Sequence, residues 1–197
     1  MSLVDSFRFA TKAQYAPGIK AAFQAYAPNV YSYYQETMCG LRNHHANLRP
    51  NFTKSAFAAA TFNLGPRTIT RPHIDHLNLP TGWCAITALG SYDPKLGGHL
   101  VLWDLKLIVE FPPGSTILIP SAIFRHSNLP IGEDGVRYSF TQYSAGGLFR
   151  WVSNGFRSQK EFDAEGGRKK EGGCERWIKG LELFSTMEEL CALAKEQ

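Results

Sequence analysis

The sequence lacks any hydrophobic run of the length that a membrane helix needs. It has 197 residues, and no apolar stretch approaches the roughly 20 residues that span a bilayer. Its first residues, MSLVDSFRF, also lack the basic flank and apolar segment of a secretory signal. These absences argue against a membrane protein and against secretion, so we expect a nuclear or cytoplasmic location.

Cysteine is scarce, and the cysteines that are present are not paired in sequence. The four are Cys39, Cys84, Cys174 and Cys191, which lie far apart and form no CxxC motif. This spacing favours free thiols in a reducing compartment over a disulfide framework. It also argues against a zinc site built from cysteine.

Acidic residues are nearly absent from the first third of the chain. Residues 1–72 contain eight Lys/Arg and two Asp/Glu, residues 73–149 contain four and six, and residues 150–197 contain nine of each. The net charge of +4 therefore originates before residue 73. An excess of this kind suits a polyanionic partner such as nucleic acid, and a solvated basic surface is the alternative.

The chain is rich in the residues that build a folded core. Hydrophobic residues make up 44% and aromatic residues 13%, enough for one globular domain. We expect a mostly helical part over residues 1–54, a β-rich core over 55–158, and a charged loop followed by a C-terminal helix over 159–197. Ser185 and Glu188 suggest a capping box for that last helix, which we expect to dock on the sheet.

Short apolar runs broken by turn residues dominate the middle of the chain. Runs rich in β-branched and aromatic residues alternate with Gly/Pro turns, a pattern typical of an all-β sandwich or barrel. The runs are SAFAAATFNLG, TITRPHIDHLN, GWCAITALGSY, HLVLWDL, LKLIVEF and STILIPS. The later stretch FDAEGGRKKEGGCERW is charged and glycine-rich and predicts a loop.

The segment RPHIDHLN carries two metal-ligand side chains, His73 and Asp75. On a β-strand, residues i and i+2 point to the same face, so both would reach one metal ion. His126, in SAIFRHSN, offers a third ligand. Two histidines and one carboxylate form the facial triad of non-haem Fe(II) oxygenases. His76 lies on the opposite strand face, and His99 favours a packing or supporting role.

Arg137 follows His126 in the sequence VRYSF. We expect the two residues on strands joined by a hairpin and facing one cavity. Ser139, two residues on, would face the same side as Arg137. A guanidinium with a neighbouring hydroxyl suits the carboxylate of a dicarboxylate co-substrate, and the alternative is a buried arginine paired with an acid of the fold.

Other polar and aromatic side chains have two possible roles. The tandem His44 and His45 stand in the loop-like stretch LRNHHANLRPNF, where exposed loop histidines are expected and a substrate-contacting loop is the alternative. Phe62, Trp83 and Tyr92 are expected to pack in the core, with stacking on a nucleobase as the alternative.

The order HxD, His, RxS resembles the Fe(II)/2-oxoglutarate dioxygenase superfamily. Residues 55–158, including FNLGPRTITRPHIDHLN and YSFTQYSAGGLFRWVSNGFRS, resemble its TET/JBP-like branch expanded in basidiomycete fungi. The resemblance implies a mainly β fold with flanking helices and a double-stranded β-helix core of the jelly-roll, cupin-like kind. It also implies Fe(II) on His73, Asp75 and His126, 2-oxoglutarate on Arg137 and Ser139, O₂ as oxidant, and a substrate-binding role for Asn78.

The function implied by this resemblance is oxidation of a methyl group on a nucleobase, with release of succinate and CO₂. We expect 5-methylcytosine first, DNA in preference to RNA, and a monomer. The chain lacks the Cys-rich zinc-binding region of animal TET proteins. One alternative is a 2-oxoglutarate-dependent hydroxylase or demethylase of N6-methyladenine, a protein side chain or a small molecule. Another is a catalytically silent metal-binding barrel of the cupin type.

Overall fold

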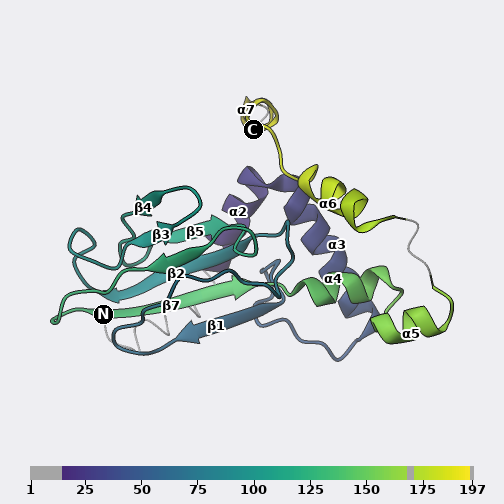
Figure 1. The fold of residues 1–197 in the computed structure, drawn as a ribbon, viewed down its shortest axis with the longest axis horizontal. Coiled ribbons are helices and arrows are strands. Elements are labelled where there is room, and N and C mark those ends of the chain that lie inside the picture. Colours follow the sequence, from purple (N-terminus) through teal and green to yellow (C-terminus); the bar gives the residue numbers. More distant parts are fainter. Residues whose placement is uncertain (1–14, 168–170, 196–197) are drawn as a thin grey trace.

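Two antiparallel sheets form the centre of the computed structural model, which describes residues 15–167 and 171–195 (Figure 1). One sheet has four strands in the order β1-β7-β2-β5, and the other has three in the order β4-β3-β6. The strands are β1 (Ala59–Asn63), β2 (Cys84–Ser91), β3 (Leu100–Leu102), β4 (Leu107–Val109), β5 (Thr116–Ile119), β6 (His126–Asn128) and β7 (Val136–Tyr143).

The chain passes repeatedly from one sheet to the other. Strands β1, β2, β5 and β7 belong to the four-stranded sheet, and β3, β4 and β6 belong to the three-stranded sheet. Between β1 and β2, the chain also runs beside the edge strand β6 of the smaller sheet, where His73 bridges to His126. This alternation between two facing antiparallel sheets is that of a jelly roll, so the predicted fold class is confirmed.

The two sheets enclose a small apolar core. Cys84 and Ala88 of β2 pack with Leu100 and Leu102 of β3 and with Ile119 of β5. These side chains come from alternate positions of each strand, which point to one face. The sequence runs that supply them, GWCAITALGSY, HLVLWDL and STILIPS, were predicted as strands, and β2, β3 and β5 confirm them.

A second core lies between helices α2 (Tyr15–Tyr26) and α3 (Pro28–His44) and one end of the larger sheet. Phe23 stacks on Trp83 and Phe57, and the Tyr34 hydroxyl donates to the Trp83 carbonyl at 3.0 Å. These two helices lie in the part, residues 1–54, that was predicted to be mostly helical, and residues 1–14 of that part lie outside the described residues.

Helix α3 continues without a break through Gly40, a residue of low helix propensity. Tyr34, Met38 and Leu41 are all buried and follow one another at helical spacing. Their shared apolar face continues past the glycine and outweighs its low helix propensity, so the helix ends only at His44.

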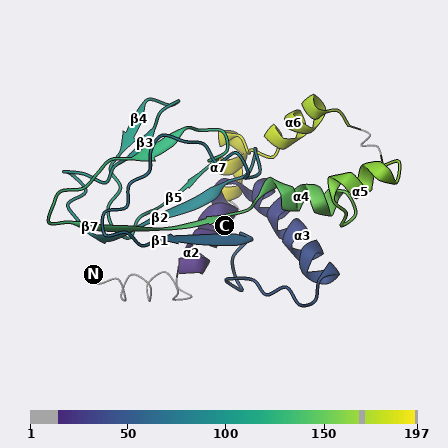
Figure 2. The same ribbon diagram turned by 60° about the horizontal axis from the view of Figure 1, so that its bottom comes forward.

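The charged C-terminal stretch is more helical than the sequence suggested. After α4 (Gly146–Ser153) come α5 (Gln159–Ala164) and α6 (Gly173–Leu181), which occupy much of the predicted loop. Ser158 and Glu161 form a reciprocal capping box that starts α5, a local signal that the glycine content of the stretch obscured. Figures 1 and 2 show these helices at the end of the molecule opposite β4.

The last helix, α7 (Met187–Lys195), confirms the predicted C-terminal helix, with two corrections. Its capping box uses Thr186 and Glu189, one residue later than the predicted pair. It contacts α2 and stands away from the sheets in Figure 1, so it does not dock on a sheet face. Within the described ranges, no helix combines the length and the hydropathy that crossing a bilayer requires.

Candidate metal centre

The segment from Thr68 to Asn78 was predicted as a strand, but it is not a regular one. Together with the preceding Arg67 it forms only isolated bridges, Arg67 beside Arg137, His73 beside His126 and Asn78 beside Ala145. Pro72 has no backbone N–H to donate to a ladder. A turn closed by the Asn78 amide on the Asp75 carbonyl, at 2.9 Å, ends the extended backbone.

The bridge at His73 brings the three predicted metal ligands together. His73 and His126 exchange both backbone hydrogen bonds, at 3.0 and 2.9 Å, and the Asp75 amide donates to the Ser121 carbonyl at 3.0 Å. One ligand atom from each of His73, Asp75 and His126 lies within 4.8 Å of the others. His73 and Asp75 were predicted to lie close together because they share one strand face. In the structure, the pairing of His73 with β6 brings the ligands together instead.

The two imidazole rings are held in the tautomer that a metal ligand needs. Nδ1 of His73 lies 2.8 Å from the Arg71 carbonyl, and Nδ1 of His126 lies 2.9 Å from the Phe124 carbonyl. A carbonyl only accepts, so each Nδ1 carries the proton, and Nε2 keeps its lone pair. Burial lowers the pKa of His126, which favours the neutral ring that binds metals.

Exposure differs sharply between the three ligand side chains. His73 and Asp75 have side chains that are 41% and 33% exposed, whereas His126 is 4% exposed. Nε2 of His73 lies 3.7 Å from Oδ1 of Asp75. Two imidazole nitrogens and one carboxylate oxygen converge from one side, the donor set that suits Fe(II) with open positions. The residues present therefore fit the metal that the sequence implied.

A cavity of about 500 Å³ extends from these side chains into the space between the sheets. Arg137 and Ser139 of β7 line it together with the three ligands. The prediction that His126 and Arg137 face one cavity is confirmed, but their strands do not form a hairpin. β6 and β7 belong to different sheets, because the connection between them crosses from one layer to the other.

Arg137 is buried without an acidic partner. It is 2% exposed, its Nη1 donates to the Thr68 carbonyl at 3.0 Å, and its Nε has no hydrogen-bond partner. No ion pair within the described residues includes it, which contradicts the alternative of an acid from the fold. Burial lowers the pKa of its guanidinium, against an opposing effect of Tyr92.

Polar side chains that the sequence did not single out complete the cavity wall. Asn63 of β1 donates to the Ser139 hydroxyl at 2.8 Å. Asn128 of β6 accepts from the amide and the hydroxyl of Thr70, both at 2.8 Å. Asn63 stands opposite Ser139 in the β1–β7 register, a pairing that no local spacing in the sequence reveals.

Asn78 lines the same cavity. Its Nδ2 lies 3.3 Å from Oδ2 of Asp75 and 3.1 Å from the Ser121 hydroxyl. His76 also lines the cavity, and His99 does not, and neither belongs to the metal-binding group found among the described residues. The Nδ1 atom of His99 is buried without a hydrogen-bond partner.

The aromatic side chains with two possible roles pack against the protein. Phe62 packs on Phe140, Trp83 stacks on Phe23, and the Tyr92 hydroxyl donates to the Phe111 carbonyl.

The tandem histidines are exposed, as expected, but they are not isolated in a loop. His44 stacks on Phe156 with ring centroids 4.0 Å apart, and His45 stacks on Trp151 at 5.1 Å. Both partners lie in or just after α4, outside the cavity lining.

Comparisons with known proteins give partial likenesses. No protein-family model matches the sequence, and no curated protein matches it significantly. A solved structure of NgTET1 in complex with 5mC DNA matches with 19% identity over 53% of this chain and 41% of that chain, with a TM-score of 0.42. The 2OG complex of the viral collagen prolyl hydroxylase vCPH from Paramecium Bursaria Chlorella virus-1 matches with 14% identity over 55% of this chain and 68% of that chain, with a TM-score of 0.31. The chain thus spans less than half of the NgTET1 chain.

Proposed function

We propose that the protein is an Fe(II)/2-oxoglutarate-dependent dioxygenase. The observation that carries this proposal is the buried guanidinium of Arg137, which has no acidic partner among the described residues and lies in the cavity that also holds the three metal-ligand side chains. A buried charge without a partner costs several kcal/mol. A dicarboxylate that binds the metal at one end and Arg137 at the other would neutralise that charge.

Each cavity residue has a definite part in this proposal. His73, Asp75 and His126 would hold Fe(II), and Arg137 with Ser139 would bind the far carboxylate of 2-oxoglutarate. The bound iron would supply oxidation of a C–H bond by O₂, coupled to decarboxylation of the co-substrate to succinate and CO₂. The two sheets exclude water from the inner part of the cavity, while the partly exposed His73 and Asp75 leave its outer part open to substrate.

For the substrate, we propose a methyl group on a nucleobase, with 5-methylcytosine in DNA first and a monomeric enzyme. Support comes from the resemblance of residues 55–158 to TET/JBP-like enzymes and from Asn78 in the cavity lining. The excess of positive charge before residue 73 also suits a polyanion. A methyl group inside a duplex requires its base to be flipped out of the stack.

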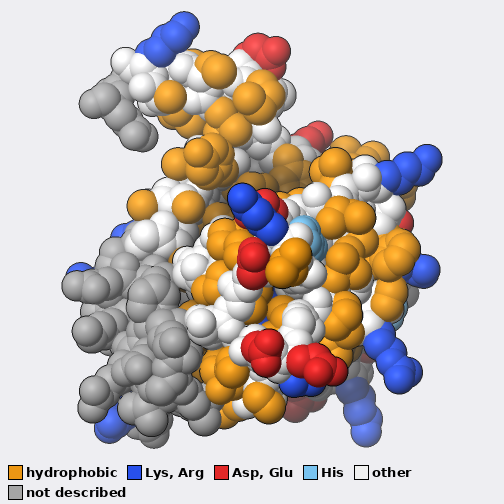
Figure 3. Space-filling model, turned by 90° about the vertical axis from the view of Figure 1, so that its left-hand side faces the viewer, with side chains coloured by type: hydrophobic (Ala, Val, Ile, Leu, Met, Phe, Trp, Pro, Cys, Tyr) orange, Lys and Arg blue, Asp and Glu red, His pale blue; other side chains and the backbone are white. Residues whose placement is uncertain are grey.

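The arrangement of charge favours a second candidate, a hydroxylase or demethylase of N6-methyladenine, a protein side chain or a small molecule. Of the basic residues before residue 73, Lys20 and Arg42 lie on helices α2 and α3, and Arg67 and Arg71 lie on the segment that carries the ligands. Figure 3 views the end of the molecule opposite the helices, and its Lys and Arg side chains stand apart. Among the described residues, they form no continuous basic surface on that face.

One experiment separates these candidates. The protein would be incubated with Fe(II), 2-oxoglutarate and a panel of methylated DNA and RNA oligonucleotides, and products would be identified by mass spectrometry alongside succinate release. Oxidised 5-methylcytosine is expected, and D75A serves as the inactive control. Succinate formation with no nucleobase product would agree with the oxygenase proposal and refute the proposal of a nucleobase substrate. No turnover of 2-oxoglutarate with any substrate class would refute the oxygenase.

A further inference from the structure

Ser121 is a buried member of a hydrogen-bond chain that leads to Asp75. It is 1% exposed, and its hydroxyl accepts from Nδ2 of Asn78 at 3.1 Å. The same Nδ2 lies 3.3 Å from Oδ2 of Asp75. The Ser121 carbonyl also accepts from the Asp75 amide at 3.0 Å. Ser121 therefore holds the Asp75 backbone directly and its carboxylate through Asn78.

The chemistry of the partners fixes which way the Asn78 amide points. An ionised carboxylate only accepts hydrogen bonds, so the group facing Asp75 must be the NH₂ and not the carbonyl. With Oδ2 occupied in this way, the free oxygen of the carboxylate is Oδ1, which lies 3.7 Å from Nε2 of His73. The carboxylate is thus turned so that Oδ1 faces the imidazole of His73 while Oδ2 faces Asn78.

We infer that Asn78 and Ser121 are positioning residues that present Asp75 to the metal through one oxygen. The inference rests on the metal site of the proposed function, and it extends the role of Asn78 beyond a substrate contact. Both N–H donors of Asn78 serve this chain, which leaves its carbonyl as the group available to a substrate. A carboxylate held through one oxygen occupies one coordination position and leaves the others for the co-substrate and O₂.

The test measures metal affinity in the absence of turnover. Mn(II) binding to the full chain would be followed by calorimetry for the wild type, N78A, S121A and the double variant. Loss of a partner that orients a metal ligand typically weakens binding about 10–100-fold, and we expect this loss in each single variant. Because both residues belong to one hydrogen-bond chain, their effects should overlap. The double variant should therefore bind Mn(II) only slightly more weakly than the single variant with the lower affinity.

Ser55 provides the matched control. Its hydroxyl donates to the side-chain amide of Gln142 at 2.7 Å, and it is buried at 9% exposure, but neither residue lines the cavity. S55A therefore removes a comparable buried hydrogen bond away from the metal site. We expect unchanged Mn(II) affinity in S55A, and thermal melting of the metal-free proteins would report its effect on stability.

The outcomes are distinguishable. Wild-type affinity in both N78A and S121A overturns the inference and leaves the proposed function standing. Equal weakening in S55A also overturns it, because the effect would then follow general stability. Absence of Mn(II) binding by the wild type overturns the metal site itself and the inference with it. Asn78 is only partly buried, so N78A keeps the test valid if S121A does not fold.

Discussion

At the scale of single residues, the histidines and carboxylate of the site were predictable and their hydrogen-bond partners were not. The HxD spacing, His126 and Arg137 were found because their chemical types are rare and their order is characteristic. Ser121 and Asn63 are common polar residues, and only folding places them beside Asp75 and Ser139. The sequence contains no local signal for a contact between residues so far apart along the chain.

Alanine at His73 or Asp75 should abolish metal binding and turnover while the fold remains. Both side chains are substantially exposed, so their removal leaves no buried cavity. Mn(II) calorimetry and circular dichroism would measure the two effects, with H76A as a control expected to bind metal normally. Retention of metal binding and activity in H73A or D75A would contradict the ligand assignment.

Methionine at Arg137 should stabilise the ligand-free protein while abolishing its response to 2-oxoglutarate. Replacing a buried charge by an apolar side chain of similar length is often neutral or stabilising by about 1–4 kcal/mol. Melting curves with Mn(II), with and without 2-oxoglutarate, would show whether the co-substrate still raises the melting temperature.

Arg67 is the matched control for this test. It bridges to Arg137 through the backbone, but its side chain is exposed and donates to the Glu133 carbonyl. R67M should keep the full response to 2-oxoglutarate. An equal response in R137M would remove Arg137 from the co-substrate site.

At the scale of elements, strands with strong apolar patterns were predictable, and the segment that carries the ligands was not. β2 has a largely apolar run, and β7 alternates Val136, Tyr138 and Phe140 with polar residues. The Thr68–Asn78 segment was also predicted as a strand, but Pro72 and the turn at Asn78 limit it to isolated bridges. α5 was missed because a capping box rather than an apolar stripe defines it, and α6 was missed because the glycines at its start, Gly172 and Gly173, are typical of a loop.

Gly90 fixes the approach of β2 to β7 at the residue that carries the co-substrate arginine. It pairs with Arg137, has φ of +116°, and a Cβ added there would lie 2.1 Å from the Val136 carbonyl oxygen. G90A should therefore lower the free energy of unfolding by several kcal/mol and raise the apparent KM for 2-oxoglutarate. Chemical denaturation and steady-state kinetics would measure the two effects.

The variant G114A is the control that distinguishes the effect of backbone strain from that of a steric clash. Gly114 also has a positive φ, +92°, but a Cβ there would meet nothing within 4 Å. G114A should cost only about 1–2 kcal/mol, the strain of a left-handed residue, and leave the KM unchanged. Equal effects of G90A and G114A would show that the close β2–β7 contact does not position Arg137.

At the scale of the whole molecule, Cys84 should report global unfolding. It lies at 0% exposure in the core between the sheets, and burial raises the pKa of its thiol to about 12. The other cysteines, Cys39, Cys174 and Cys191, are exposed. A thiol reagent should modify those three at once and Cys84 only as denaturant unfolds the protein.

The variant C84A identifies the slow thiol. It should show the same three reactive groups with and without denaturant, because the fourth is gone. Rapid modification of Cys84 in the native protein would mean that the two sheets separate without unfolding of the whole molecule.

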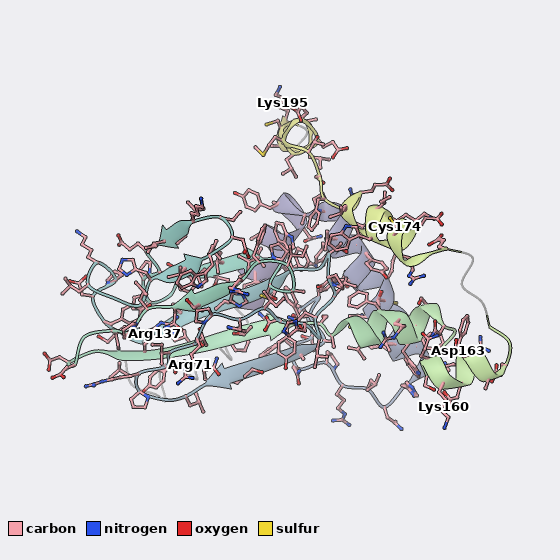
Figure 4. The ribbon with its side chains drawn as sticks, viewed as in Figure 1. Arg71, Arg137, Lys160, Asp163, Cys174 and Lys195 are labelled. Carbon is pink, nitrogen blue, oxygen red and sulfur yellow. The ribbon has the colours of Figure 1, made fainter. Side chains whose placement is uncertain are left out.

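The contrast between the exposed and buried parts of the site has a practical consequence. Arg137 and His126 lie in the interior, whereas the side chains of His73 and Asp75 are partly exposed to water. Figure 4 labels Arg137 and also Arg71, which belongs to the segment that carries His73 and Asp75. A metal bound by partly exposed side chains is readily removed by chelators and replaced by competing divalent ions. The protein as purified is thus expected to carry little iron, and its occupancy in a cell would follow the supply of free Fe(II).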